Sequence, residues 1–153
     1  VHFLVFGEGA DRARLEEKAQ QEGITNIRFC GQLTQDKVPT VLRKAALSFI
    51  PLKTANMKDS VPTKLYEALG HGCPVLLMAV GDAAAVLAQT GLGESISPDE
   101  ADKLPGVFAT MLDNQVLYMA RRENAMALVR DRYSRQSEAA KLEGLLRTLC
   151  EAS

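Results

Sequence analysis

The side chains best suited to chemistry in this sequence lie in one run, Ser60-Val61-Pro62-Thr63-Lys64, and in Glu67 just after it. The apolar spacing that follows predicts a helix from Thr63 to about His71, so the run stands at a helix start. A helix N-terminus has unsatisfied N–H groups and about half a positive charge, which favours a bound diphosphate. Lys64 adds a full, mobile charge that can follow phosphate oxygens. The run therefore predicts an anion-binding site.

The predicted helix has one polar face, on which Lys64, Glu67 and His71 lie. Its apolar side chains turn to the core, and these are Leu65, Ala68 and Leu69. A carboxylate on the polar face could accept two hydrogen bonds from the hydroxyl groups of a ribose. The spacing alone leaves an alternative open, in which Lys64 and Glu67 form a solvated salt pair.

Strand-like and helical runs alternate along the chain. Strands are expected over residues 4–6, 27–30, 47–50, 74–78 and 93–96. Helices are expected over residues 10–22, 36–46, 63–71 and 83–90, and from Pro98 to the end with breaks near Pro105 and at Tyr133-Ser134. This order predicts an α/β fold: a Rossmann-like, doubly wound parallel sheet with C-terminal helices. No linker composition marks a second domain, so one domain is expected over residues 1–153.

Ligands of doubly wound sheets bind at the carboxyl ends of the strands, where three loops are expected here. The loop over residues 7–9 reads Gly-Glu-Gly, but Arg12 stands where a dinucleotide-binding fingerprint needs its third glycine. A tight turn and a ligand contact both remain open for it. The other two loops cover residues 31–34 and 53–63.

The segment after this last loop resembles the donor-site signature of the group-one, family-four glycosyltransferases. It reads Val61-Pro62-Thr63-Lys64-Leu65-Tyr66-Glu67-Ala68-Leu69-Gly70-x-Gly72-x-Pro74-Val75. These are retaining enzymes with the GT-B architecture of two facing Rossmann-like domains. The order of the flanking strands matches the C-terminal, donor-binding domain, and the resemblance covers nearly the whole chain. It implies transfer of a sugar from a nucleoside diphosphate sugar to an acceptor in cell-surface polysaccharide or glycolipid synthesis.

The resemblance also gives roles to individual residues. Glu67 matches the second of two acidic residues that have seven between them, and is expected to bind the ribose hydroxyls. The first falls on Asp59, which would contact the transferred sugar. The family more often has glutamate there, and Gly-Phe-Gly where this chain continues with Ser60-Val61. A plain loop aspartate is the alternative for Asp59.

The diphosphate would lie on the amides around Pro62 to Lys64, and the base near Gly31 to Leu33. The expected donor-binding residues are Gly7, Gly31, Leu33, Ser60, Val61, Pro62, Thr63, Lys64 and Glu67. Gly81-Asp82 could border the same cleft, although an N-cap is the simpler expectation for Asp82.

Two parts of such an enzyme are expected to be missing. One is the first βα unit of the domain, whose strand would lie centrally, beside residues 4–6. The other is the N-terminal, acceptor-binding domain. Because Val1 already belongs to an apolar run, we expect a chain truncated at its N-terminus and inactive by itself. It would fold with a gap, a rearranged edge or lowered stability.

Composition bears on the partners. The 46% hydrophobic and 24% charged fractions are those of an average soluble protein, and no apolar run approaches the ~20 residues of a membrane span. A net charge of −1 argues against nucleic acid. We expect a cytoplasmic protein, with peripheral contact to the inner face of the membrane as an option.

Cys30, Cys73 and Cys150 lack metal-ligand spacing, so no metal or cofactor is expected. Cys30 and Cys73 are expected to be buried free thiols.

Two other functions remain open. A sugar-nucleotide epimerase of GT-B architecture would need paired catalytic carboxylates and histidines, of which this sequence shows few. A non-catalytic ligand-binding domain on a flavodoxin-like sheet would bind no sugar nucleotide.

Overall fold

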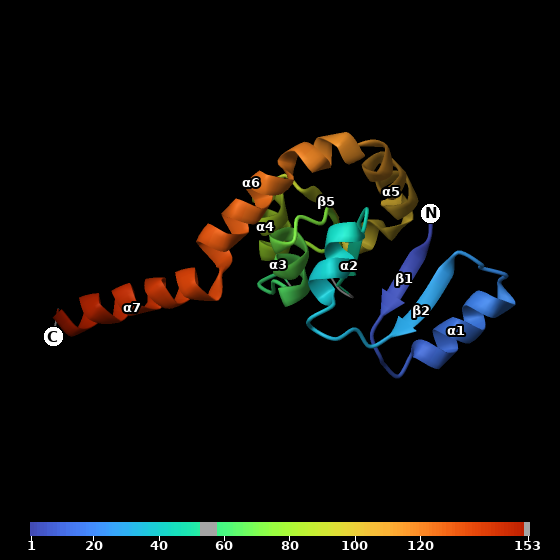
Figure 1. Ribbon diagram of the computed structural model, residues 1–153, viewed down its shortest axis with the longest axis horizontal. Coiled ribbons are helices and arrows are strands. Elements are labelled where there is room, and N and C mark those ends of the chain that lie inside the picture. The colour runs from blue at the N-terminus through green and yellow to red at the C-terminus, as the bar shows by residue number, and fades with distance from the viewer. Residues whose placement is uncertain (53–57, 152–153) are drawn as a thin grey trace. The chain divides into compact units, whose positions relative to one another are not determined.

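The computed structural model describes residues 1–52 and 58–151, and it has the predicted alternation of strands and helices (Figure 1). The strands are β1 (Phe3–Phe6), β2 (Ile27–Gly31), β3 (Ser48–Pro51), β4 (Val75–Met78) and β5 (Gly93–Ile96). The helices are α1 (Arg12–Gln21), α2 (Val38–Lys44), α3 (Thr63–Gly70), α4 (Asp82–Thr90), the 3-10 helix η1 (Pro98–Lys103), α5 (Leu104–Asp113), α6 (Gln115–Tyr133) and α7 (Arg135–Glu151). The chain divides into two compact units, Val1–Val41 and Leu42–Ser153.

The first unit contains β1, β2 and α1. The two strands pair in parallel, from Phe3 opposite Ile27 to Phe6 opposite Gly31. Ala19 is buried on α1, whereas Leu15, one turn earlier, is 41% exposed. The side of this helix that carries both residues is therefore only partly covered.

One cysteine prediction is wrong. Residues alternate along β2 between half-buried and exposed positions, and Cys30 lies on the exposed side. Its apolar neighbours Phe29 and Ile27 point to the other side, which is why local composition misplaced it.

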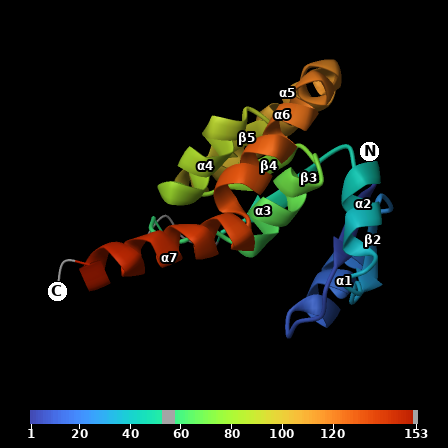
Figure 2. The same ribbon diagram turned by 60° about the vertical axis from the view of Figure 1, so that its left-hand side comes forward.

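The second unit is built on a three-stranded parallel sheet in the order β3-β4-β5. Val75, Leu76 and Leu77 on the central strand are fully buried, as is typical of a parallel strand covered on both faces. Strand β5 lies at an edge of this sheet. Helices α3 and α4 both pack against α6, which runs beside them (Figure 1, Figure 2). The large side chains of this core are Leu65, Leu69, Leu76, Leu77, Leu87, Leu92 and Met111.

The parallel strands form two sheets where one was expected. Within residues 1–52 and 58–151, no hydrogen-bonded ladder joins β1 to β3. One domain over residues 1–153 stays a prediction.

Two breaks between the C-terminal helices fall where the sequence predicts, whereas the break at Asn114, between α5 and α6, was not predicted. Ser97 accepts a hydrogen bond from the Asp99 N–H (3.3 Å) and so caps η1, which α5 follows at Leu104. Helix α6 ends at Tyr133, and Ser134 adopts an extended conformation and accepts a hydrogen bond from the Ser137 N–H (3.1 Å). This extended residue turns the chain into α7.

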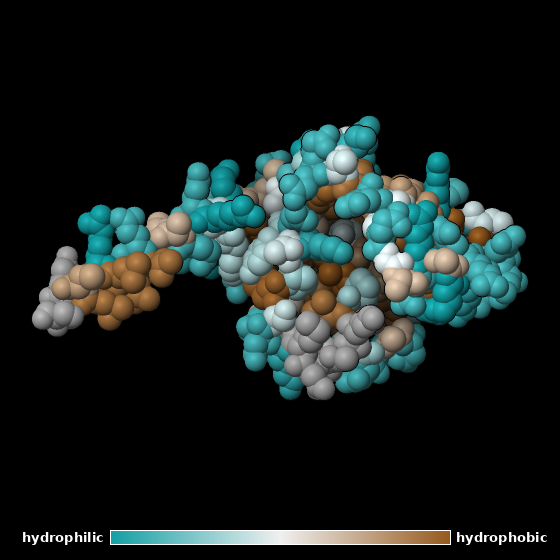
Figure 3. Space-filling view, turned by 90° about the horizontal axis from the view of Figure 1, so that it is seen from below, coloured by the Kyte–Doolittle hydropathy of each residue, from teal (hydrophilic) through white to brown (hydrophobic). Residues whose placement is uncertain are grey.

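Helix α7 exposes an apolar stripe along one face (Figure 3). Its members are Leu142, Leu145, Leu146 and Leu149, each more than half exposed. Among the helices of the described residues, none is long and apolar enough to cross a bilayer.

Candidate functional site

The start of α3 is a helix end without a side-chain cap. Pro62 is the N-cap residue, in an extended conformation (φ −68°, ψ 136°), and its carbonyl accepts the first helical hydrogen bond, from the Leu65 N–H (2.9 Å). Proline presets that conformation, so the helix begins at Thr63 as predicted. Among residues 1–52 and 58–151, no side chain satisfies the first N–H groups, which leaves the amides of Thr63 and Lys64 available to an anion.

The two faces of α3 divide as the sequence predicts. Leu65, Ala68 and Leu69 are fully buried in the core of the second unit. Thr63, Lys64 and Glu67 are exposed. Although both are described residues, Lys64 and Glu67 form no salt bridge with each other. The alternative of a solvated salt pair is therefore not what this structure shows, and both charged groups are available to a ligand.

The carboxyl end of α3 is tightly closed. Gly72 has a left-handed backbone (φ +68°), and the next residue, Cys73, donates its N–H back to the Ala68 carbonyl (2.9 Å). The Gly72 carbonyl accepts a hydrogen bond from Arg122 Nε on α6 (2.7 Å). A Cβ at position 72 would lie 2.6 Å from that nitrogen, so only glycine leaves room for it. The sequence alone did not predict this contact, because Arg122 lies 50 residues from Gly72 in the chain.

The loop before α3 contacts the loop after β4. The Asp82 N–H donates to the Lys58 carbonyl oxygen (2.8 Å), which places the start of α4 beside the residues that lead to Asp59. Asp59 is exposed and Ser60 is half-buried. Residues 53–57 of the expected ligand loop lie outside the described residues.

The prediction of Asp82 as an N-cap is off by one residue. Gly81 is the N-cap of α4, with φ 74° and ψ −140°, and Asp82 is the first helical residue. Glycine adopts that conformation without strain, whereas aspartate would not, and the helix therefore starts one residue earlier than expected. In the first turn the Asp82 carboxylate still interacts favourably with the helix dipole.

Tyr66 connects α3 to the end of α6. Its ring lies against that of Tyr133, with centroids 5.2 Å apart and planes tilted by 36°. The Tyr133 hydroxyl donates to Gln89 on α4 (3.0 Å). Partial burial raises the pKa of Tyr66, and the nearby Tyr133, Glu138 and Asp82 raise it further, so its hydroxyl stays protonated at neutral pH.

Two expected site residues meet in the first unit. The Gly7 N–H donates to the Gly31 carbonyl oxygen (2.8 Å) at the carboxyl ends of β1 and β2. Both glycines have positive φ, 127° and 71°. Leu33 is half-buried just beyond them. The structure thus brings the loops of these two strands together, while the assignment of Gly7, Gly31 and Leu33 to the donor stays a prediction.

Arg12, which stands where the dinucleotide fingerprint would have a glycine, is held by carboxylates. It pairs with Glu8 and, at 2.8 Å, with Glu16. The hydrogen bond that Arg12 donates to the Glu16 carboxylate is the largest cause that raises the pKa of the guanidinium. These exposed pairs brace the turn from β1 into α1.

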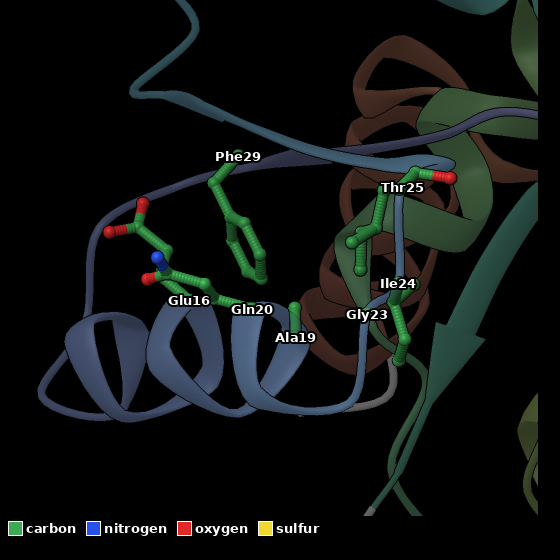
Figure 4. Close-up of a pocket in the computed structure, with 8 residues that line it drawn as sticks. Glu16, Ala19, Gln20, Gly23, Ile24, Thr25 and Phe29 are labelled. Carbon is green, nitrogen blue, oxygen red and sulfur yellow. The ribbon is translucent and has the colours of Figure 1, made fainter.

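A hollow of about 360 Å³ lies between α1 and β2 (Figure 4). The Phe29 ring points from the strand toward the helix, and Ala19 points up from the helix (Figure 4). The hollow includes Gly23, Ile24 and Thr25, which lead into the start of β2. It therefore lies at the opposite end of the strand from Gly31 and is not where the ligand loops gather. Within the described ranges, no group of His, Cys, Asp and Glu side chains is arranged to hold a metal ion.

Comparison with known proteins identifies the family. The family model for glycosyl transferases group 1 matches residues 1–127. The chain belongs to the group 1 glycosyl transferases. The match contains the whole of α3 and the loops over residues 7–9, 31–34 and 53–63. The family resemblance drawn from the residues around Glu67 is therefore confirmed.

Relatives of this glycosyl transferase chain include WcaI of Escherichia coli K12, whose name assigns it provisionally to colanic acid biosynthesis. WcaI is 27% identical over 107 residues, which are 67% of this chain and 26% of WcaI. The solved structure of WaaG, a glycosyltransferase involved in lipopolysaccharide biosynthesis, matches with 26% identity and a TM-score of 0.72, over 92% of this chain and 37% of WaaG.

Sucrose-phosphate synthase from Thermosynechococcus elongatus has a similar fold. Its TM-score is 0.81 at 22% identity, over 98% of this chain and 39% of the synthase. The fold is therefore the Rossmann-like α/β fold of GT-B glycosyltransferases, as predicted. The group 1 chain spans between about a quarter and two fifths of the length of these three proteins.

Proposed function

We propose that this chain is the donor-binding part of a retaining glycosyltransferase. It would bind a nucleoside diphosphate sugar, whose glycosyl group moves to an acceptor hydroxyl. The observation that carries the proposal is the uncapped start of α3, with exposed Lys64 and Glu67 on one face, in a member of the group 1 family.

The start of α3 suits a diphosphate leaving group. In the transfer, the bond between the anomeric carbon and the phosphate oxygen breaks, and a bond from that carbon to the acceptor oxygen forms. The acceptor hydroxyl gives up its proton, which the departing diphosphate takes up. Negative charge develops on the departing diphosphate. The free amides of Thr63 and Lys64, together with the Lys64 ammonium, would stabilise that charge, and they need no reorganisation because the helix holds them in place.

Glu67 would bind the ribose. It is exposed one turn beyond Thr63, and as a carboxylate it can accept hydrogen bonds from both ribose hydroxyls. Asp59, Ser60 and Val61 would line the side of the transferred sugar. No metal ion is needed in this scheme, because the helix start and Lys64 supply the positive charge.

The acceptor and its binding domain belong to the proposal for the whole protein. We propose an acceptor-binding domain outside this chain, and an acceptor in cell-surface polysaccharide or glycolipid synthesis, made in the cytoplasm or at the inner face of the membrane. The names of WcaI and WaaG support this choice. Retention of anomeric configuration rests on the family resemblance, and NMR of the product's anomeric proton would test it in the whole enzyme.

Calorimetric titration tests donor binding. UDP, GDP, ADP, TDP and CDP are titrated into the 153-residue chain, then into Glu67→Ala and a control, Glu123→Ala, which removes an exposed carboxylate from α6. Saturable binding of at least one nucleotide, weakened about tenfold or more by Glu67→Ala alone, is expected, because two charge-assisted hydrogen bonds are lost. If no nucleoside diphosphate binds, the chain is a non-catalytic domain and the proposal fails.

A further inference from the structure

The contact between Gly81 and Lys58 joins two loops that are 23 residues apart in the chain. Gly81 follows β4, and Lys58 precedes Asp59 in the loop that enters α3. The Asp82 N–H donates to the Lys58 carbonyl oxygen (2.8 Å), so the contact is between backbones and does not depend on the Lys58 side chain.

Position 81 has room for glycine only. A Cβ there would lie 2.8 Å from both the carbonyl carbon and Cα of Lys58, and closer still to its carbonyl oxygen. These are backbone atoms, which cannot rotate away as the end of a side chain could. The backbone at Gly81 is also left-handed (φ +74°), which disfavours any side chain. A larger residue must therefore push the Lys58 backbone away from β4.

We propose that Gly81 is a positioning residue that holds Lys58 and Asp59 at the sugar side of the donor site. The inference rests on the proposed function of this site. The start of α3 is fixed independently by Leu65 and Leu69, which are fully buried in the core. Displacement of Lys58 therefore moves the sugar-side loop while the diphosphate-binding amides stay in place.

Comparing the binding of a nucleoside diphosphate with that of a sugar nucleotide separates the role of the α3 start from the role of the loop at Asp59. A nucleoside diphosphate uses the α3 start and Glu67, whereas the sugar of a sugar nucleotide also needs the loop at Asp59. Gly81→Ala should therefore lower the affinity for the sugar nucleotide and leave the affinity for the nucleoside diphosphate unchanged. The matched control is Gly91→Ala, at the other end of α4: Gly91 is also left-handed (φ +60°), but the nearest atoms to its Cβ belong to the Arg121 side chain, at 3.6 Å.

The experiment combines binding with amide hydrogen exchange. The variants and the unchanged 153-residue chain are titrated with UDP and UDP-glucose, GDP and GDP-mannose, ADP and ADP-glucose, TDP and TDP-glucose, and CDP and CDP-glucose. In Gly81→Ala, Kd for the sugar nucleotide that binds is expected to rise about tenfold, since the displaced Asp59 loses a charge-assisted hydrogen bond to the sugar. Its nucleoside diphosphate should change less than about twofold relative to Gly91→Ala. Exchange at the Asp82 amide should rise in Gly81→Ala only, because that N–H donates to the Lys58 carbonyl oxygen.

Three other outcomes would contradict either the proposed function or the role of Gly81. If the chain binds no nucleotide at all, the proposed function fails, and exchange at the Asp82 amide still tests the anchoring contact. If Gly81→Ala and Gly91→Ala behave alike in both measurements, Gly81 is not a positioning residue. If Gly81→Ala weakens nucleotide and sugar nucleotide equally, the helix start has moved, and the inference is also overturned.

Discussion

Arg122 Nε lies 2.7 Å from the carbonyl oxygen of Gly72, and this hydrogen bond joins the middle of α6 to the end of the helix that begins the candidate site. Nη2 of the same guanidinium donates a hydrogen bond to the Arg43 carbonyl oxygen at the end of α2 (3.1 Å). One side chain thus satisfies carbonyl groups at the carboxyl ends of two helices, where a positive charge also interacts favourably with the helix dipole.

Arg122→Ala is expected to lower the free energy of unfolding by about 1 to 2 kcal/mol, because two hydrogen bonds from a charged, partly exposed donor are lost. Urea denaturation measures the change. The matched control is Arg121→Ala, which removes one exposed hydrogen bond, to the Gly91 carbonyl (3.1 Å), and should cost less. Equal losses in the two variants would show that the contact with Gly72 contributes nothing specific.

Lys64→Ala is expected to weaken binding of the nucleoside diphosphate by about 1 to 2 kcal/mol, or roughly 5- to 30-fold, because one charged contact to phosphate is lost. Binding of the corresponding nucleoside, which has no phosphate, should not change. Titrations at two salt concentrations provide a further check, since the loss should shrink as salt rises. Equal weakening of nucleoside and diphosphate would place Lys64 away from the phosphates.

Leu76→Ala is expected to lower the free energy of unfolding by about 2 to 5 kcal/mol, because Leu76 is fully buried on the central strand. Leu145→Ala, on the exposed stripe of α7, should change it by less than about 0.5 kcal/mol. Denaturation of both variants measures the contrast. A large loss in Leu145→Ala would mean that the apolar face of α7 is covered in solution.

Cys73 should be much less reactive than the other two cysteines. Burial raises the pKa of its thiol from an ordinary value near 9 to about 11, against a lowering by nearby Arg122, whereas Cys30 and Cys150 are exposed. With a thiol-reactive chromophore at pH 8, two thiols should react quickly and the third only on unfolding. Rapid reaction of all three would contradict the burial of Cys73.

The same pKa makes stability depend on pH. Because the folded state holds the Cys73 proton more tightly than the unfolded state, stability is unaffected below about pH 9 and falls as pH rises toward about 11. The slope from this group is at most about 1.4 kcal/mol per pH unit. Cys73→Ala should lose that part of the decline when denaturation is followed from pH 8 to 11.

The sequence by itself was enough to predict what depends on neighbouring residues. The apolar run over residues 74–78 predicted strand β4, and the apolar spacing after Pro62 predicted both the start of α3 at Thr63 and its inner face at Leu65 and Leu69. In each case the signal comes from residues that are close by in the sequence. Local apolar periodicity and helix-start signals were therefore enough for these predictions.

Only the tertiary structure decided which distant segments meet. Arg122 and Gly72 are 50 residues apart, and neither residue type predicts the other as its partner. The exposure of Cys30 and the N-cap role of Gly81 also depended on what packs around them. A pattern of apolar residues specifies which face of an element is buried. The chain segment that covers that face depends on packing among all the elements at once, so the backbone contact between Gly81 and Lys58 could be found only in the folded molecule.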